Sequence, residues 1–259
     1  MRRLIVFLFV IFIALPLAAQ DADFFYSRGT IWHQAGNFDK AIEDYSAALA
    51  LEPKDAQIWS DRGSAYYEKG DMNKALADFD KALSLDPRLE YAYYGRGIIY
   101  HAHGNYDRAI EEYTKALNIN PYDVDIWADR GYAYLDMGDE EKAIGDLSKA
   151  ISLNPNDAST WVSRAGAYLS LEQYDKALED CNRALAIKPN SDAALLTRGE
   201  AYLAKGDADK ALTDLNKAIS INPNEAAAYD SRSAAHLARG EFEQAIEDLN
   251  KAQALKKDR

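Results

Sequence analysis

The sequence holds one cysteine, seven prolines and fourteen glycines among its 259 residues. A single cysteine excludes a disulfide-stapled fold, and so few prolines and glycines exclude collagen and low-complexity linkers. Basic residues are outnumbered, because 30 Lys and Arg against 42 Asp and Glu give a net charge of −12. Nucleic-acid backbones are held by clustered Lys and Arg, so this balance argues against a nucleic-acid partner. With 48% hydrophobic and 11% aromatic residues, the chain has enough apolar surface to build a packed core.

Residues 1–20 have the layout of a secretory signal peptide. Arg2 and Arg3 precede an apolar run from Leu4 to Leu15, and small residues follow up to Ala19. Basic, apolar and small segments in this order are typical of a signal peptide. Counted through Ala19, the apolar stretch is 16 residues long, which is shorter than the ~20 residues of a membrane-spanning helix. We expect cleavage near Ala19 and an exported protein, periplasmic or extracellular; an uncleaved N-terminal membrane anchor is the alternative.

The rest of the chain repeats with a period of 34 residues. Six of the seven prolines are spaced at this interval: Pro53, Pro87, Pro121, Pro155, Pro189 and Pro223. Residues 22–259 divide into seven units, 22–55, 56–89, 90–123, 124–157, 158–191, 192–225 and 226–259. A fixed period of this length indicates a single domain built by stacking one supersecondary unit.

Each unit has the periodicity of two helices. In the second unit, Trp59, Gly63 and Tyr66 recur at the spacing of one helical face. A glycine then breaks the pattern, and Asp71 is well suited to begin a second helix, whose small and aromatic stripe covers 75–82. Such a helical hairpin cannot bury its apolar faces alone and must stack on its neighbours. The sequence therefore predicts an all-α fold, an α-solenoid of antiparallel helix pairs.

The units resemble tetratricopeptide repeats, a family with a 34-residue period and a defined signature. The fourth unit carries that signature as Trp127-x-x-Arg130-Gly131-x-x-Tyr134, Ala143-x-x-x-Leu147 and Pro155. The resemblance covers the whole of residues 22–259. It implies a right-handed superhelix in which the first helices line a concave, peptide-binding groove. It also implies a non-enzymatic binding module without a cofactor, and it does not identify the partner.

One departure from the family signature recurs in all seven units. An arginine occupies the place of the signature leucine, and an acid follows it sixteen residues later. Because antiparallel helices bring these two positions to the same side of their interface, we predict seven structural Arg–carboxylate pairs, within a unit or to its neighbour. An arginine ladder for anionic ligands is the alternative. The predicted pairs are Arg28 with Asp44, Arg62 with Asp78, Arg96 with Glu112, Arg130 with Asp146, Arg164 with Asp180, Arg198 with Asp214, and Arg232 with Asp248.

The groove implied by the family geometry is acidic. Its positions on the seven first helices carry eight acids and neither Lys nor Arg. We read this face as complementary to a neutral or basic polypeptide segment, although a merely solvated face of an acidic protein is the simpler reading. The groove acids are Asp23, Asp61, Glu68, Asp125, Asp129, Asp136, Glu200 and Asp230.

Aromatic residues gather on the same face in the first four units. Tyrosine combines a large contact area with a hydrogen-bonding tip, which suits it to interfaces, but packing between repeats would also explain it. We predict the partner site in this acidic, Tyr-lined region, above all from Tyr67 through Asp136. The candidate residues are Tyr26, His33, Asp61, Tyr67, Glu68, Tyr91, Tyr94, His101, Asp125, Asp129, Tyr132 and Asp136.

Catalytic and metal-binding patterns are not evident. His101 and His103 point to different sides of one helix, and His33 lies two units away from His101. Cys181 takes a core position of its second helix, so we expect a buried, inert thiol. The sequence predicts neither an enzyme nor a cofactor site.

The two ends of the repeat array are lightly capped. In the last unit Gln253 replaces a large aliphatic residue, and Phe24 follows the leader almost directly. Terminal repeats need a polar outer face, and light capping leaves homo-oligomer formation through these ends as an alternative. The favoured function is an adaptor that binds a protein or peptide in the cell envelope, without a stable membrane span if the leader is cleaved. The alternatives are a self-associating structural protein and a soluble ligand-handling component of an envelope transport complex.

Overall fold

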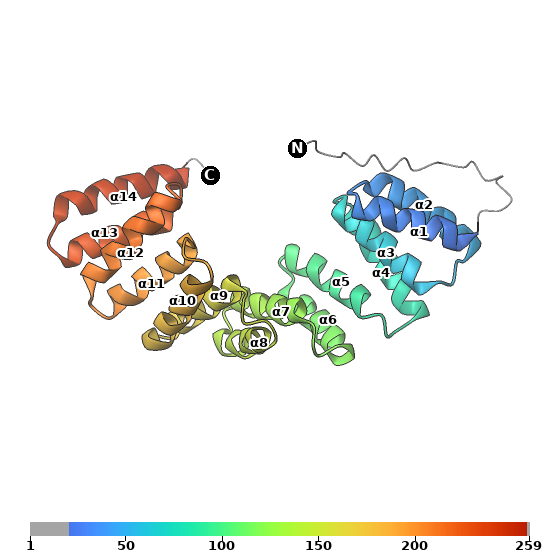
Figure 1. Cartoon of the computed structure of the whole chain (residues 1–259), viewed down its shortest axis with the longest axis horizontal. Helices are drawn as coiled ribbons and strands as arrows, with labels where there is room; N and C mark the ends of the chain where they lie inside the picture. Colours follow the sequence, from blue (N-terminus) through green and yellow to red (C-terminus); the bar gives the residue numbers. More distant parts are fainter. Residues whose placement is uncertain (1–20, 258–259) are drawn as a thin grey trace, which may run out of the picture. The chain divides into compact units, whose positions relative to one another are not determined.

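Residues 21–257 are described by the computed structural model, and this part of the chain consists of fourteen α-helices without strands (Figure 1). The first helices of the pairs are α1 (Ala22–Gln34), α3 (Ala56–Glu68), α5 (Glu90–Ala102), α7 (Val124–Met137), α9 (Ala158–Ser170), α11 (Asp192–Ala204) and α13 (Ala226–Ala238). The second helices are α2 (Phe38–Leu51), α4 (Met72–Leu85), α6 (Tyr106–Ile119), α8 (Glu140–Leu153), α10 (Tyr174–Ile187), α12 (Ala208–Ile221) and α14 (Phe242–Lys257).

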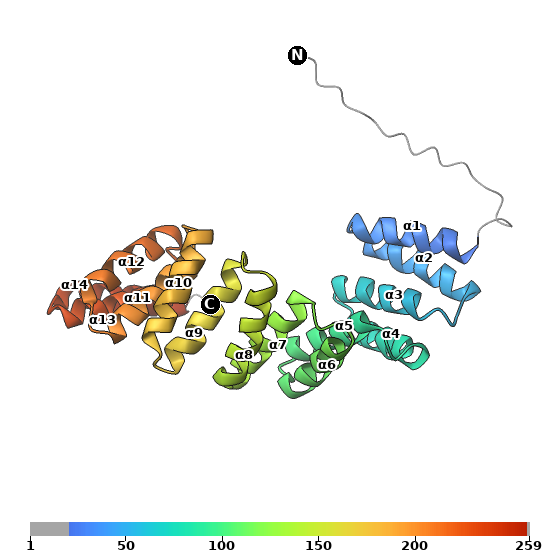
Figure 2. The same ribbon diagram turned by 60° about the horizontal axis from the view of Figure 1, so that its bottom comes forward.

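The chain divides into two compact units, unit 1 up to Arg96 and unit 2 from Gly97. The boundary falls within α5, so unit 1 holds α1–α4 and the start of that helix, and unit 2 holds its remainder and α6–α14. Figure 2 shows α1 and α2 side by side in unit 1, with α3 next to them. The prediction of an all-α solenoid of antiparallel helix pairs is confirmed. The predicted signal peptide lies outside the described residues.

Local sequence sets where the helices begin and turn. The carboxylate of Asp55 caps α3 by accepting the backbone N–H of Gln57 at 2.8 Å, and Asp71 caps α4 by accepting that of Lys74 at 3.3 Å. Between these helices Gly70 has φ +88°, a left-handed conformation that a side chain would disfavour. The sequence around α3 and α4 therefore encodes both helix starts and the tight turn between them.

In five of the seven repeats a glycine lies where the two helices of the repeat cross and approach closely. A Cβ added to Gly199 in α11 would lie 2.8 Å from Cγ of Leu215 in α12, which is too near for unchanged packing. The equivalent Gly63 faces the ring of Phe79 in the same way. Leu215 and Phe79 are buried, so the glycine leaves room for the largest side chain of each hairpin core.

Stacking of the repeats curves unit 2. The second helices α8, α10 and α12 each pack on their own first helix and on the first helix of the next repeat, as α10 does with α9 and α11. First helices also contact one another, α9 with α11 and α11 with α13, whereas within the described part of unit 2 neighbouring second helices do not. The first helices are therefore the more closely spaced and form the inner face of this unit. None of the helices in residues 21–257 is long and apolar enough to cross a bilayer.

Candidate protein-binding site

The outer side of the first helices carries a row of bidentate ion pairs. In six repeats the arginine Nε and Nη2 donate to the two carboxylate oxygens of an aspartate in the same repeat, with N···O distances of 2.5–2.8 Å. The aspartates are buried. The seventh predicted pair, Arg96 with Glu112, is not among these six, because its two residues belong to different units. The six pairs are Arg28–Asp44, Arg62–Asp78, Arg130–Asp146, Arg164–Asp180, Arg198–Asp214 and Arg232–Asp248.

The third guanidinium nitrogen ties each repeat to the one before it. From the second repeat on, the arginine Nη1 donates to a side-chain oxygen of the preceding second helix, two residues after the acid of the predicted pair on that helix. This bond was not predicted from the sequence, although the acceptor position is Ser, Thr, Asn or Asp throughout, a signal that could have revealed it. The bonds are Arg62–Ser46 at 3.0 Å, Arg96–Asp80 at 2.7 Å, Arg130–Thr114 at 2.9 Å, Arg164–Ser148 at 2.8 Å, Arg198–Asn182 at 2.7 Å and Arg232–Asn216 at 2.7 Å.

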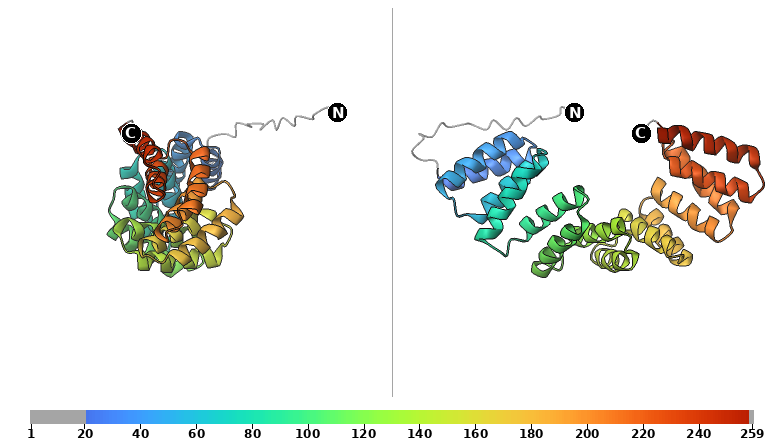
Figure 3. Two further views of the ribbon diagram at one scale, coloured as in Figure 1. Left: turned by 90° about the vertical axis from the view of Figure 1, so that its left-hand side faces the viewer. Right: turned by 180° about the vertical axis from the view of Figure 1, so that it is seen from behind.

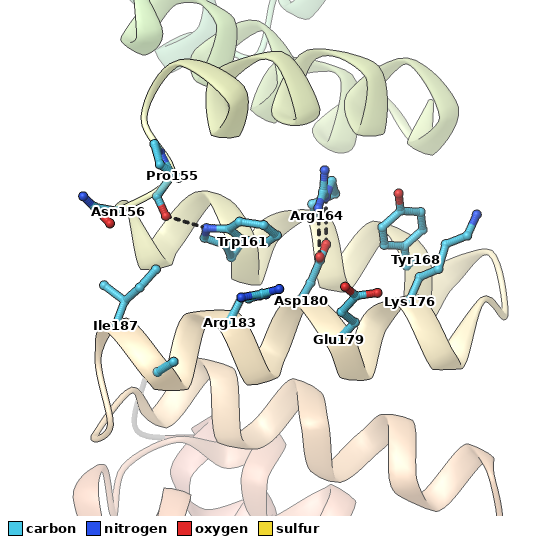
Figure 4. A pocket seen from close by; sticks show the side chains of 11 residues that line it. Pro155, Asn156, Trp161, Arg164, Tyr168, Lys176, Glu179, Asp180, Arg183 and Ile187 are labelled. Atoms are coloured by element: carbon cyan, nitrogen blue, oxygen red, sulfur yellow. Dashed lines mark hydrogen bonds and ion pairs between the residues drawn. The ribbon is translucent and has the colours of Figure 1, made fainter.

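A pocket of about 550 Å³ opens over one of these pairs, between α9 and α10 (Figure 4). Its floor is Arg164, whose guanidinium carbon lies 5.0 Å from the ring centre of Trp161 and 5.7 Å from that of Tyr168. Trp161 donates its indole N–H to the carbonyl of Pro155 at 2.9 Å. Each of the three guanidinium nitrogens of Arg164 thus donates within the protein, to Asp180 or to the preceding repeat, which favours a structural role over an anion site.

In unit 1 the inner face joins an acid to a tyrosine of the preceding repeat. Tyr26 Oη donates to Asp61 Oδ2 at 2.8 Å, and Gln57 Nε2 donates to Oδ1 of the same carboxylate at 2.9 Å. Burial raises the pKa of Asp61 above its ordinary value, and the two donors partly counter the rise. Burial and the neighbouring carboxylate also raise the pKa of Tyr26. Both side chains are half-buried, so this pair stabilises repeat packing.

In unit 2 three inner-face acids also have partners. His101 Nε2 lies 2.7 Å from Asp136 Oδ2. Ser231 Oγ donates to Glu200 Oε1 at 2.9 Å, and burial raises the pKa of that glutamate. Asp230 is paired with Lys256 Nζ of α14 at 2.6 Å. These acids are engaged within the unit and are less available to a partner than sequence position alone suggested.

The remaining predicted residues differ in exposure. Asp23, Glu68 and Asp125 are exposed, and their carboxylates make no hydrogen bond or ion pair within the described residues. Tyr91 is 66% exposed, whereas Tyr132 is half-buried. Tyr67, Tyr94 and Asp129 are half-buried and already have interactions in the protein. His33 packs on the rings of Phe38 and Tyr45.

Comparison with known families decides the identity of the repeats. Residues 19–259 match the tetratricopeptide repeat model described as "Cilia and flagella-associated protein 70 C-terminal domain". The chain belongs to this family. Repeats of this kind are in general protein-binding modules without catalytic activity. A comparison of this tetratricopeptide repeat protein with curated proteins finds none that matches.

Solved structures share the fold. YrrB, described as a TPR protein with an unusual peptide-binding site, is 27% identical with a TM-score of 0.65, over 71% of this chain and 95% of its own. A tetratricopeptide repeat protein from Parabacteroides merdae is 22% identical with a TM-score of 0.67, over 90% and 93% of the two chains. PilF of Pseudomonas aeruginosa is 19% identical with a TM-score of 0.70, over 80% and 94%.

Ligands for a metal do not converge in the described part of this tetratricopeptide repeat protein, where no three His, Cys, Asp or Glu side chains gather. Cys181 is fully buried in α10, and burial raises the pKa of its thiol to about 12. A thiol with that pKa stays protonated at neutral pH and is a poor nucleophile.

Proposed function

We propose that this protein is a scaffold that binds neutral or basic polypeptide segments along the first helices of its repeats, within unit 1 and within unit 2. One observation carries the proposal: the inner face keeps exposed acids and tyrosine while it has no lysine or arginine at its groove positions. Acids with partners stabilise the stack, whereas Asp23, Glu68 and Asp125 have no such role in the described residues.

Electrostatics favours a basic partner over an acidic one. Unpaired carboxylates on a face without cations attract lysine and arginine and repel acidic chains, an effect that acts mainly on the rate of encounter and on specificity. Exposed charges of this kind are screened by salt. The tyrosines offer contact area to the peptide between the charged points. The peptide-binding site described for YrrB shows that a related repeat array can bind a polypeptide.

A charge-matched comparison tests the proposal. The test variant carries Asp23→Asn, Glu68→Gln and Asp125→Asn on first helices. The control variant carries Glu43→Gln, Glu179→Gln and Glu247→Gln, three exposed acids on second helices. Both variants lose three negative charges, so the overall field changes equally. The readout is fluorescence anisotropy with a labelled Lys-Ser-Leu dodecapeptide and a Glu-Ser-Leu dodecapeptide as the acidic counterpart.

The wild type and the control variant are expected to bind the lysine peptide with a salt-dependent affinity, and the test variant is expected to lose about ten-fold at low salt, equivalent to ~1.4 kcal/mol. The acidic peptide should not bind. Equal losses in the two variants would mean that net charge alone acts. A greater loss in the control would place the binding surface on the second helices.

We also propose that the protein acts outside the cytoplasm, in the cell envelope. The support is the basic, apolar and small-residue order of residues 1–20. Intact-mass measurement of the protein recovered from the envelope and culture fractions tests it. The expected mass is that of a chain beginning just after Ala19, and a full-length mass in the cytosolic fraction would contradict export.

A further inference from the structure

The last helix, α14, exposes a side that its equivalents bury. Leu249 is 48% exposed, whereas the equivalent Leu215 and Cys181 are fully buried. At these positions the side chain lies against the next repeat: a Cβ on Gly95 of α5 would come within 2.4 Å of the equivalent Phe79 of α4. Leu249 is therefore one half of an inter-repeat contact, and no helix in the described part of unit 2 supplies the other half.

Other residues of α14 extend this apolar surface. Phe242 and Ile246 are 65% and 59% exposed, while the residue equivalent to Ile246 in α12, Leu212, is 7% exposed. Asn250 occupies the position whose counterpart Asn216 accepts the arginine Nη1 of the following repeat. We name the surface of Phe242, Ile246, Leu249 and Asn250 the α14 face. Figure 3 shows α14 at the edge of unit 2.

The first helix, α1, presents the opposite half of the same contact. Ile31 is 63% exposed, whereas its equivalents Ala65 and Ile99 are fully buried. Ile99 shows that this position can bury an isoleucine. Arg28 uses Nε and Nη2 on Asp44, and within the described residues its Nη1 has no acceptor, although every later arginine of the row donates that nitrogen to the preceding repeat. We name the surface of Phe24, Arg28 and Ile31 the α1 face.

We propose that the α14 face of one molecule docks on the α1 face of a second copy, reproducing the contact between successive repeats. The junction would bury Leu249 and Ile31, and Nη1 of Arg28 would donate to Asn250 Oδ1 as Arg232 does to Asn216. Two unsatisfied halves of one repeated interface are complementary to each other and not to themselves. The contact is therefore head-to-tail, and each added copy exposes a new α14 face and a new α1 face for further growth.

Cross-complementation of two single-face variants tests this proposal. Ile31→Glu places a charge in the α1 face and leaves the α14 face intact, while Leu249→Glu does the reverse. Both residues are exposed in the monomer, and thermal unfolding checks that both variants fold. The molar mass of the particles in solution is measured by light scattering coupled to size exclusion, from micromolar to millimolar protein. The sample is the gene product, whose N-terminus is first established by intact-mass spectrometry.

The wild type is expected to grow in mass with concentration. Each variant alone is expected to stay monomeric, because each lacks one half of every contact. Their equimolar mixture is expected to double in mass and stop there, because one intact junction remains per pair. Tyr122→Glu, an exposed aromatic outside both faces, is the control and should behave as wild type.

Three results would overturn the proposal. A wild type that stays monomeric over the whole range would exclude the contact. Self-association retained by Ile31→Glu would indicate a symmetric contact of α14 faces. A mixture that remains monomeric would show that the two faces do not recognise each other. If Leu249→Glu unfolds, Ile246→Glu replaces it as the α14-face variant with the same expectations. None of these results depends on peptide binding by the inner face.

Discussion

The two sides of each first helix are built on different rules. On the outer side, the arginine and its aspartate recur in the same geometry in six repeats, and the third guanidinium nitrogen joins neighbouring repeats. On the inner side the residues change from repeat to repeat: Tyr26 binds Asp61, His101 lies against Asp136, and Glu200 accepts from Ser231.

The difference separates structure from recognition. A feature that must hold every repeat in register is copied into every repeat, because each junction has the same geometry. A surface that recognises one partner has no reason to be periodic. The outer row is thus the scaffold, and the irregular inner face is where a partner would be distinguished. Four measurements break or sharpen this comparison.

The largest expected effect is on the outer side. Arg164→Ala should lower the free energy of unfolding by about 3–5 kcal/mol, because it leaves the buried Asp180 carboxylate without its partner. Denaturation by urea measures it. Replacing both partners, by Arg164→Met with Asp180→Leu, should restore most of the loss. Lys142→Ala, which removes an exposed ion pair with Asp139, should leave stability nearly unchanged. Similar losses for the arginine and lysine variants would refute a structural role of the row.

A pair of glycine substitutions contrasts the helix crossing with the inner face. Gly199→Val should cost ~1–3 kcal/mol, because its side chain would collide with buried Leu215. Gly166, on the inner face of α9, has nothing within 4 Å of an added Cβ. Gly166→Ala should therefore stabilise the protein by up to ~1 kcal/mol through helix propensity. Thermal unfolding reports both, and a stabilising Gly199→Val would contradict the packing described.

The smallest effect concerns an inner-face acid. Tyr26→Phe removes a donor that favours the Asp61 carboxylate, so the pKa of Asp61, already raised by burial, should rise further. Since the folded state then binds a proton more tightly than the unfolded state, the contribution of Asp61 to stability falls as the pH rises through its folded pKa. Carboxyl NMR titration measures the shift. Tyr91→Phe, on the same face without a contact to Asp61, is the control. An unchanged or lower pKa of Asp61 would contradict stabilisation of its carboxylate by the Tyr26 hydrogen bond.

Periodicity was enough to predict the helices, because the 34-residue interval and the helical spacing of Trp59, Gly63 and Tyr66 are local features. The pairing of arginine and acid could also be predicted, since both positions flank the same crossing. The bond from arginine Nη1 to the preceding repeat was not predicted. The recurring Ser, Thr, Asn or Asp two residues after each acid offers an acceptor, but only the stacking distance between hairpins decides that the arginine reaches it.

The candidate site was less predictable than the fold. Sequence position placed Asp61 and Asp136 on the groove, but their bonds to Tyr26 and His101 follow from the rotation between successive repeats, which no single repeat encodes. Exposure likewise separates Leu249 from Leu215, although the two residues occupy the same position of the repeat. Leu249 and Leu215 have the same residue type and the same position in the repeat, and the presence of a neighbouring helix decides which of them is buried.

Carboxyl footprinting tests the central claim most directly. The protein is labelled with a carbodiimide and an amine, with and without a saturating Lys-Ser-Leu dodecapeptide, and modified acids are located by mass spectrometry. Protection is expected at Asp23, Glu68 and Asp125 on the first helices. Unchanged labelling is expected at Glu43, Glu179 and Glu247 on the second helices. Protection of the second-helix acids, with the first-helix acids still labelled, would contradict recognition by the inner face.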